Sequence, residues 1–304
     1  MSPTLASGWY AVAESGEVKK RPRAFRRFSL DLVFWRDSQG RAAAAVDFCP
    51  HRSVRLSLGE VKGDRIQCPF HGMEFDRHGE CGLIPETGKP AAGLGTRAFP
   101  LVEDHGFLWC WYPLGGPPSG EIPWFQEIPP GLGFATIKEQ VQTHVTRAIE
   151  NQLDYAHLPF VHKATIGRGL PVRVEARFQL EEERIKFLVG KDRGPETPFI
   201  DYFLPNIWMN RISPRFMIVL AFCPLGEDAT EIYLRTYQSF LPTVIPNILS
   251  GIMNRKIFRE DARVIRTHPS GASFETGTRE KLIGSDRAIR HFRQVWTKRI
   301  PHME

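Results

Sequence analysis

Two short runs that combine cysteine with histidine constrain this chain more than any other feature. Cys49 and His51 lie in the run Cys-Pro-His. Cys68 and His71 lie in the run Cys-Pro-Phe-His. Because each cysteine is so close to its own histidine, both members of a pair can sit on one tight turn and direct a sulfur and a nitrogen atom toward a common centre. Thiolate together with imidazole suits either zinc or an iron–sulfur cluster, so the runs predict a metal site.

The mixed pairing favours one of these two metals. Structural zinc sites usually pair cysteine with cysteine and histidine with histidine at short spacings. In a Rieske centre, two histidines replace two cysteines on one iron of a [2Fe–2S] cluster, and that arrangement suits one histidine for each cysteine. A structural zinc knot, as part of a zinc-stapled binding module, is the alternative.

The residues around both runs resemble the Rieske domain of the ring-hydroxylating oxygenases, the Rieske non-haem iron oxygenase family. Proline after each cysteine fixes φ and stiffens the loop before any metal binds. Where the family commonly has Tyr and Trp in the second loop, this chain has Phe70 and Met73, which changes the surroundings of the cluster. The resemblance extends over Asp47–Arg52, Leu56–Gly59 and Cys68–Gly72.

The resemblance also implies the ligands of the cluster. Cys49 and Cys68 would bind one iron, and His51 and His71 would bind the other. Such a cluster has a reduction potential far above that of an all-cysteine cluster.

The composition indicates a folded protein of one large or two ordinary domains. The chain has 304 residues, of which 42% are hydrophobic. The cluster would use two of five cysteines and leave Cys81, Cys110 and Cys223. Cys110 and Cys223 lie in apolar, strand-like runs, where a cysteine behaves as a small buried hydrophobic residue.

The sequence also predicts a cytoplasmic location. Met1–Tyr10 lacks the charged start and apolar stretch of a secretory signal. The longest apolar run, Phe216–Phe222, is far shorter than a bilayer requires and is predicted to be a strand.

The net charge of +6 and the pI of about 9.1 raise the question of nucleic acid as a partner. The basic residues are scattered and accompany no nucleic-acid-binding motif, so a solvated surface and no nucleic acid are expected. One predicted helix, which Ser285 could cap, is an exception and could steer an acidic electron donor. Its basic residues are Arg287, Arg290, Arg293, Lys298 and Arg299.

The first part of the chain has the pattern of an all-β domain. Short apolar runs between Gly8 and Tyr112 are separated by turn sequences such as Asp37–Gly40 and Asp76–Gly79. Proline and glycine then predict a linker at 113–122. We therefore expect a Rieske domain at 1–116 and a second domain at 117–304.

The second part mixes helices and strands, which predicts an α+β fold. Strands are expected at 173–190, 200–223 and 230–240, and helices at 145–157, 247–267 and 285–299. The resemblance implies a helix-grip (START-like) domain with a central antiparallel sheet. Since no phosphate-binding glycine fingerprint occurs, we expect no NAD or flavin on this chain, and electrons would come from another protein.

A second metal site is suggested by the segment from Glu150 to His162. Asn151, Asp154 and His157 are spaced three apart, so on a helix they share one face. His157 and His162 are five apart, and Pro159 would have to disturb the helix for both rings to face one ion. Taken alone, these histidines are better interpreted as ordinary core or surface residues.

The resemblance identifies this segment with the mononuclear iron motif of the family. It implies an Fe(II) ion held by His157, His162 and a later carboxylate, which we assign to Asp261. Glu260 is the neighbouring alternative. Without the histidines, the acidic pair would be an exposed helix face paired with Arg263 or Lys256.

In the family, the aspartate at the position of Asp154 bridges this iron to a Rieske histidine of the next subunit in a ring of three. The resemblance thus implies a homotrimer, with Asp154 as a catalytic residue, and we group Asn151, on the same predicted helix face, with it. A plain helix-face acid is the other interpretation of Asp154.

The expected function is that of a terminal oxygenase component. An NAD(P)H-dependent reductase or ferredoxin would supply electrons, and O2 would be the co-substrate for hydroxylating or demethylating a small aromatic or alicyclic compound. Monooxygenation or O-demethylation is favoured over dihydroxylation. The candidate substrate-binding residues, which are alternatively plain core, are Phe203, Trp208, Asn210, Met217 and Phe240.

Two questions stay open at this point. The apolar stretch Leu241–Met253 could form an entrance flap or a packed helix. The same cluster would also suit an electron-transfer protein with a non-catalytic, hydrophobic-ligand-binding domain, which would not need His157, His162 and Asp261.

Overall fold

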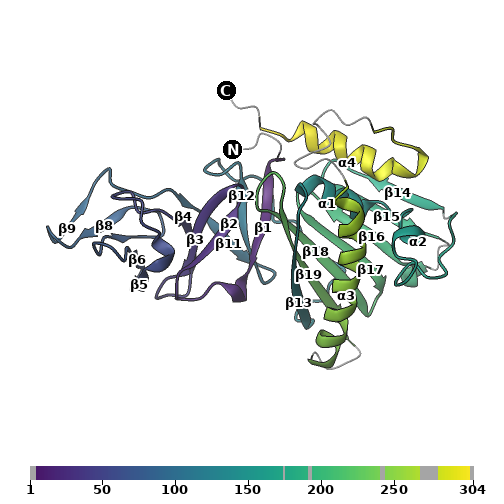
Figure 1. The fold of residues 1–304 in the computed structure, drawn as a ribbon, viewed down its shortest axis with the longest axis horizontal. Helices are drawn as coiled ribbons and strands as arrows, with labels where there is room; N and C mark the ends of the chain where they lie inside the picture. Colours follow the sequence, from purple (N-terminus) through teal and green to yellow (C-terminus); the bar gives the residue numbers. More distant parts are fainter. Residues whose placement is uncertain (1–4, 174, 191–193, 240–243, 268–279, 302–304) are drawn as a thin grey trace. The chain divides into compact units, whose positions relative to one another are not determined.

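The computed structural model describes residues 5–173, 175–190, 194–239, 244–267 and 280–301, with the side chains of the helix that begins at 244 described from Met253 onward. These residues form two compact units, Gly8–Ile122 and a second unit from Pro123 onward (Figure 1). The division thus falls a few residues after the expected boundary at 116. In the described parts of the chain, no helix combines the length and apolar character needed to cross a membrane.

The first unit consists of three antiparallel sheets, which agrees with an all-β domain. The first contains β1 (Gly8–Glu14), β12 (Phe107–Tyr112) and β11 (Leu101–Asp104). The second contains β10 (Ala98–Phe99), β4 (Ala42–Val46), β3 (Leu30–Arg36) and β2 (Arg23–Arg27). The third contains β5 (Glu60–Lys62), β6 (Arg65–Gln67), β7 (Glu74–Phe75), β8 (Cys81–Ile84) and β9 (Lys89–Ala91), and the short helices are η1 (Ser15–Glu17) and η2 (Leu56–Leu58).

Both turns expected from sequence connect neighbouring strands. In the β3–β4 turn, Asp37 Oδ1 accepts hydrogen bonds from the N–H groups of Gln39 and Arg41 at 3.0 and 2.9 Å. In the β7–β8 turn, Asp76 Oδ1 accepts in the same way from the second and fourth following residues. Gly40 and Gly79 supply the positive φ, so an aspartate and a glycine three residues apart specify each turn.

The second unit is built on one antiparallel sheet of seven strands. Its order is β13-β19-β18-β17-β16-β15-β14, so all neighbours except β13 and β19 are consecutive in the chain. The strands are β13 (Phe134–Val141), β14 (Ala176–Leu180), β15 (Arg184–Val189), β16 (Phe199–Phe203), β17 (Ile207–Ser213), β18 (Phe216–Pro224) and β19 (Thr230–Gln238).

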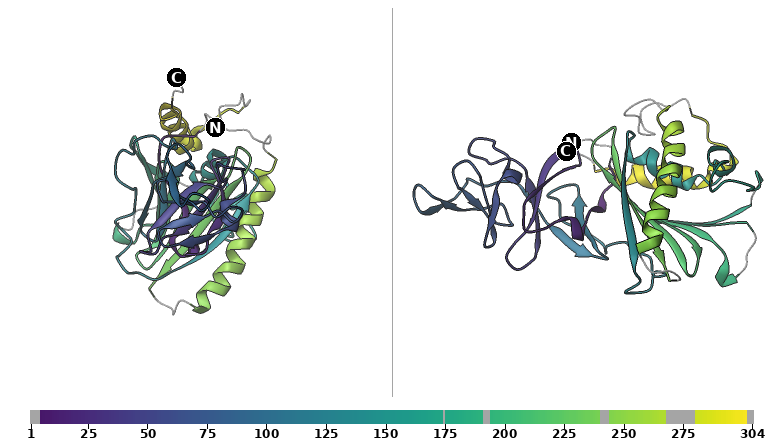
Figure 2. Two further views of the ribbon diagram at one scale, coloured as in Figure 1. Left: turned by 90° about the vertical axis from the view of Figure 1, so that its left-hand side faces the viewer. Right: turned by 60° about the horizontal axis from the view of Figure 1, so that its bottom comes forward.

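Four helices accompany this sheet in the described residues, and the long helix α3 runs beside it (Figure 2). Helix α1 contacts β18, α3 and α4, while α3 contacts β13. This arrangement confirms the expected α+β class with a central antiparallel sheet. The helices are α1 (Val145–Leu153), α2 (Leu158–Val161), α3 (Val244–Ile265) and α4 (Arg287–Lys298), with the short helices η3 (Gly194–Glu196) and η4 (Gly284–Asp286).

The backbone from Val244 onward is helical, which agrees with the helix expected at 247–267 and with the helix alternative for the apolar stretch 241–253; residues 241–243 lie outside the described residues. One expectation about the helices changes. The continuous helix expected over 145–157 is wrong, because α1 ends at Leu153. Asp154 leaves the helical conformation, with φ −93° and ψ 103°, and its Oδ1 accepts a hydrogen bond from Ala156 N at 2.8 Å.

The two histidines flank α2, and Pro159 does not break the helix between them. His157 is the N-cap of α2, and His162 is its C-cap. Pro159 lies in the first turn of α2, where a missing N–H has no cost. The chain therefore places one histidine at each end of a single helical turn.

Candidate metal centres

The two cysteine–histidine loops share one backbone geometry. In each, the cysteine N–H donates to the carbonyl five residues later, and the N–H four residues later donates back to the cysteine carbonyl. The residue at this fourth position is Ser53 in one loop and Gly72 in the other, with φ values of 56° and 71°. The bonds are Cys49 N to Val54 O at 2.8 Å, Ser53 N to Cys49 O at 2.9 Å, Cys68 N to Met73 O at 2.8 Å and Gly72 N to Cys68 O at 3.1 Å.

The four ligand candidates divide between core and surface. Cys49 and Cys68 are buried in a cluster that includes Trp35 and Phe75. His51 and His71 are exposed, and their ring centroids are 4.8 Å apart. Two buried sulfurs with two neighbouring imidazoles at the surface form a donor set that fits a Rieske [2Fe–2S] cluster.

Burial and hydrogen bonding define the surroundings of the loops. Burial raises the pKa of the metal-free Cys49 thiol to about 11, so metal binding must displace its proton. Asp47, which is fully buried, accepts hydrogen bonds from Ser57 N and Ser57 Oγ, both at 2.7 Å. This carboxylate ties the start of the first loop to η2.

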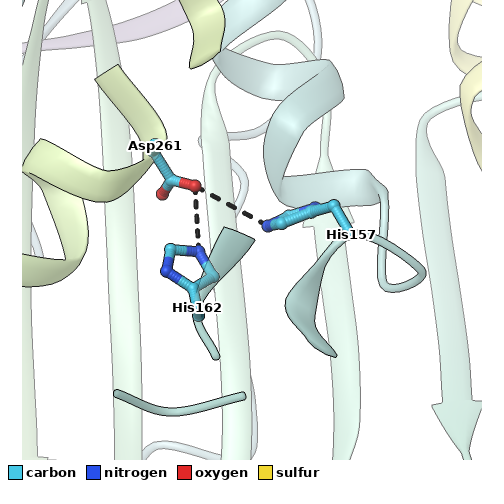
Figure 3. Close-up of side chains that lie close together, drawn as sticks. All are labelled: His157, His162 and Asp261. Atoms are coloured by element: carbon cyan, nitrogen blue, oxygen red, sulfur yellow. Dashed lines mark ion pairs between the residues drawn. The ribbon is translucent and has the colours of Figure 1, made fainter. Parts of the chain in front are cut away.

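A second group of ligand atoms lies in the second unit. One nitrogen each from His157 and His162 and one oxygen of Asp261 lie within 4.8 Å of one another. Asp261 Oδ1 is 2.9 Å from His162 Nε2 and 3.7 Å from His157 Nε2 (Figure 3). His162 and Asp261 are buried, and the side chain of His157 is 14% exposed.

The arrangement of these atoms suits coordination of a divalent metal better than hydrogen bonding among the three side chains. In the described part of the chain, the buried Oδ1 of Asp261 receives no aligned hydrogen bond, although His162 Nε2 is only 2.9 Å away. Oδ1 therefore has lone pairs available to a third atom, and Nε2 has one when the ring is neutral with its proton on Nδ1. Two imidazoles with one carboxylate suit non-haem Fe(II) and leave coordination positions open.

Glu260 lies on the other side of His162. Its Oε2 is 2.9 Å from His162 Nδ1, whereas Asp261 faces Nε2. The structure thus brings Asp261, and not Glu260, to both histidine Nε2 atoms. Burial disfavours the charged His162 ring, but the two flanking carboxylates outweigh it and raise its pKa.

Asp154 and Asn151 lie beside His157. Asp154 Oδ2 is 3.6 Å from His157 Nδ1, which has no hydrogen-bond partner among the residues described. All three residues line a cavity of about 330 Å³, together with Arg147 and Glu280. The cavity gives these side chains a common opening.

The strand register places the expected substrate-binding residues on two different faces of the sheet. Trp208 and Asn210 alternate with Met209, and Trp208 Nε1 donates to Gln152 O near the end of α1 at 3.1 Å. They therefore project from the sheet face that α1 covers.

Phe203 and Met217 lie on the other face, so assigning them to one pocket with Trp208 and Asn210 is wrong. Phe203 pairs with Ile207, and its ring lies 5.4 Å from that of Phe125. Met217 pairs with Arg211. Phe240 lies outside the described residues. Because side chains alternate along a strand, an aromatic-rich pattern without the register does not identify the face.

Two residues beside Asn210 were missed by sequence reasoning. Ile200 and Ile218 are paired with Asn210 on its two neighbouring strands and share its face. Ile218 lies in a continuous apolar run and Ile200 follows Phe199, so no alternation with polar residues marked either one, and the sequence did not reveal which strands pair.

The basic helix α4 is less available to an electron donor than expected. Arg293 pairs with Glu150 and Glu280, both through distances of 2.6 Å. Arg299 pairs with Glu183. Two of the five basic side chains are therefore neutralised within the unit, which weakens the case for this helix as a docking face.

Comparison with known proteins places these sites in context. Residues 8–100 match the model of the Rieske [2Fe–2S] domain. The chloroplastic chlorophyllide a oxygenase of Chlamydomonas reinhardtii is 38% identical over 170 residues, which cover 55% of this chain and 26% of that protein. The oxygenase component of dicamba O-demethylase from Stenotrophomonas maltophilia is 29% identical over 206 residues, 66% of this chain and 60% of that protein.

The chain thus spans less than two thirds of the length of these relatives. Its fold is similar to that of dicamba monooxygenase in the crystal structure with dicamba bound, with a TM-score of 0.78, 95% of both chains covered and 23% identity. That similarity covers both units, each of which has its counterpart in the known fold. Residues 8–100 therefore match a Rieske [2Fe–2S] domain, and the chain is similar in sequence to oxygenase components that carry such a domain and in fold to dicamba monooxygenase.

Proposed function

We propose that this chain is the terminal oxygenase component of a Rieske non-haem iron system. It would use O2 and electrons from a reductase or ferredoxin to hydroxylate or demethylate a small aromatic or alicyclic substrate. The observation that carries the proposal is the convergence of His157, His162 and Asp261 in a chain that also has a Rieske domain.

Each set of ligands would hold one metal group. Cys49, His51, Cys68 and His71 would hold the [2Fe–2S] cluster, and His157, His162 and Asp261 would hold Fe(II). When bound, the cluster supplies electrons singly and the iron activates oxygen. The protein's own part is to keep the three iron ligands buried and to leave one side of them open.

Asp154 would connect the iron centre to its electron source. Its Oδ1 is fixed by Ala156 N, which leaves Oδ2 on the side of His157 Nδ1. Since the side chain is 29% exposed, a histidine of a partner subunit could approach it. We therefore propose a homotrimer in which Asp154 links His157 to the exposed His51 or His71 of a neighbouring copy, with Asn151 lining the same cavity.

The substrate would lie against the face of the sheet that carries Trp208 and Asn210. This face is mainly apolar, with Ile200, Ile218 and Leu220 nearby, and Asn210 offers a polar anchor. Such a surface suits a flat, largely apolar molecule with a polar substituent. The similarity to an O-demethylase component supports demethylation as the first reaction to test. A cytoplasmic location stays a prediction.

Metal analysis with a visible spectrum and oxygen uptake tests the proposal. An oxygenase should contain about three irons per chain, two of them in a cluster with Rieske absorbance. With a surrogate reductase, aromatic acids, methyl ethers and amines are then screened for substrate-stimulated oxygen uptake. Only about two irons in fully loaded protein would favour the electron-transfer alternative, and zinc without colour would favour the binding module.

A further inference from the structure

We infer that Glu260 is a positioning residue that orients His162 for metal binding. This inference rests on the metal centre of the proposed function and adds to it a residue that contacts a proposed ligand but would not coordinate the metal itself.

The carboxylate of Glu260 is fixed between two partners. Its Oε2 lies 2.9 Å from His162 Nδ1 and also accepts a hydrogen bond from Thr165 Oγ1. Thr165 is itself held near His162, because its N–H donates to His162 O at 2.9 Å. The side chain of Glu260 is only 18% exposed, so solvent competes little for these bonds.

This contact determines which nitrogen of His162 faces the metal site. A neutral imidazole carries one N–H and one lone pair, and the group that accepts from the N–H selects the tautomer. With Nδ1–H donated to Glu260, the lone pair is on Nε2, which faces Asp261 and His157. A carboxylate acceptor also makes the ring a stronger ligand.

Consecutive residues of α3 therefore hold the two edges of one ring. Glu260 holds the Nδ1 edge, and Asp261 lies at the Nε2 edge. Together the two carboxylates also match the charge of a divalent ion. Burying such an ion among neutral histidines with one carboxylate would leave a net positive charge in a poorly solvated site.

The other histidine is held differently. His157 Nδ1 lies 3.6 Å from Asp154 Oδ2, and the described residues give it no hydrogen bond. His162 is thus oriented by its own chain before metal binds, whereas His157 is not. The two ligands should respond differently to loss of their neighbouring carboxylates.

Co(II) binding to chelator-treated protein tests this inference without measuring turnover. Affinity is measured by equilibrium dialysis, and the ligand geometry by the EPR spectrum of Co(II) with the cluster oxidised. We expect Glu260→Ala to weaken Co(II) binding by about 10- to 100-fold and to alter the spectrum. Glu260→Gln retains an oxygen acceptor for Nδ1–H, so it should recover part of the affinity.

Arg259→Ala is the matched control, because Arg259 is exposed on the same helix. It should bind Co(II) like the unsubstituted chain. If Glu260→Ala matches this control in affinity and spectrum, the inference is overturned. Equal losses in the Ala and Gln variants, together with a lower melting temperature of the metal-free protein, would indicate a merely structural role and also overturn it.

Two further variants keep the result interpretable. Thr165→Val removes the hydroxyl that fixes Glu260, so it should lower the Co(II) affinity less than Glu260→Ala does. It serves as the test variant if Glu260→Ala does not fold. Asp261→Asn should remove most Co(II) binding. Unchanged binding in Asp261→Asn would instead show that the proposed metal centre is wrong, and the inference would fall with it.

Discussion

The cluster loops and the His157–His162–Asp261 centre are constructed in opposite ways. Each loop closes on itself through two backbone hydrogen bonds, and all four proposed ligands lie between residues 49 and 71. The second centre joins the two caps of one short helix to a helix far along the chain, where Glu260 is 98 positions after His162. The first site is therefore a property of local backbone, and the second is a property of the tertiary fold.

This difference predicts different sensitivities. Changes in backbone freedom should affect the cluster loops, whereas the second centre should respond to side chains that orient the histidines or support α1, α2 and α3. The following experiments test that contrast, starting with the largest expected effect.

Asp154→Asn tests whether the two differently built sites work together. Asparagine has nearly the same shape but no charge, so both metals should stay bound while turnover falls by about 100-fold. Iron content, the Rieske spectrum and reductase-driven oxygen uptake are measured on one preparation. Full activity with the natural reductase and with a chemical donor would exclude the proposed bridge.

Acid should weaken the second unit through His144, the N-cap of α1. Burial and the nearby Arg147 lower its pKa from 6.5 to about 4. Because the unfolded chain takes up this proton near pH 6.5 and the folded chain only near pH 4, the free energy of unfolding keeps its full value above pH 6.5. It should fall by about 3 kcal/mol in total as the pH decreases toward 4. The free energy of unfolding as a function of pH measures it.

His144→Asn is the control for this titration, because asparagine can still cap the helix. Carboxylates titrate in both proteins, so the difference between the two curves isolates the histidine. Parallel curves between pH 6.5 and 4 would mean that His144 titrates normally.

Gly72→Ala tests the backbone of the second cluster loop. Gly72 has a φ of 71°, and an added Cβ would lie 3.1 Å from Pro85 Cγ. The backbone strain should lower the free energy of unfolding by about 1–2 kcal/mol and reduce cluster occupancy, while the second centre keeps its metal. Chemical unfolding and Rieske absorbance provide the readouts; unchanged values for both would show that this conformation is not required.

Ser53→Gly makes the opposite change at the equivalent position of the first loop. Ser53 adopts a φ of 56°, which glycine adopts without strain. The relief of about 1 kcal/mol is partly offset by the entropy of glycine in the unfolded chain, so a gain near 0.5 kcal/mol is expected. A loss of stability would show that the serine side chain contributes more than its backbone strain costs.

The same contrast explains what could be predicted from the sequence. The proposed cluster ligands and the aspartate–glycine turns were identified from residues a few positions apart, and the α+β order of elements follows from hydrophobic patterns. The end of α1 was missed because the spacing of Asn151, Asp154 and His157 also suits a helix, and the turn made by Asp154 becomes visible only in its bond to Ala156.

The remaining errors concern contacts between distant segments. Phe203 and Met217 could not be assigned to a face without the strand register. Glu260 appeared only as an alternative to Asp261, because its contact with His162 depends on how α3 packs beside α2. Sequence spacing carries no information on either point.

Metal content of two single-site variants tests most directly the claim that the sites are separately built. Cys68→Ser should lose the Rieske absorbance and about two irons per chain but keep one, and Asp261→Asn should keep the absorbance and about two irons but lose one. Loss of all iron from both variants would contradict the account, because it would show a single interdependent metal assembly.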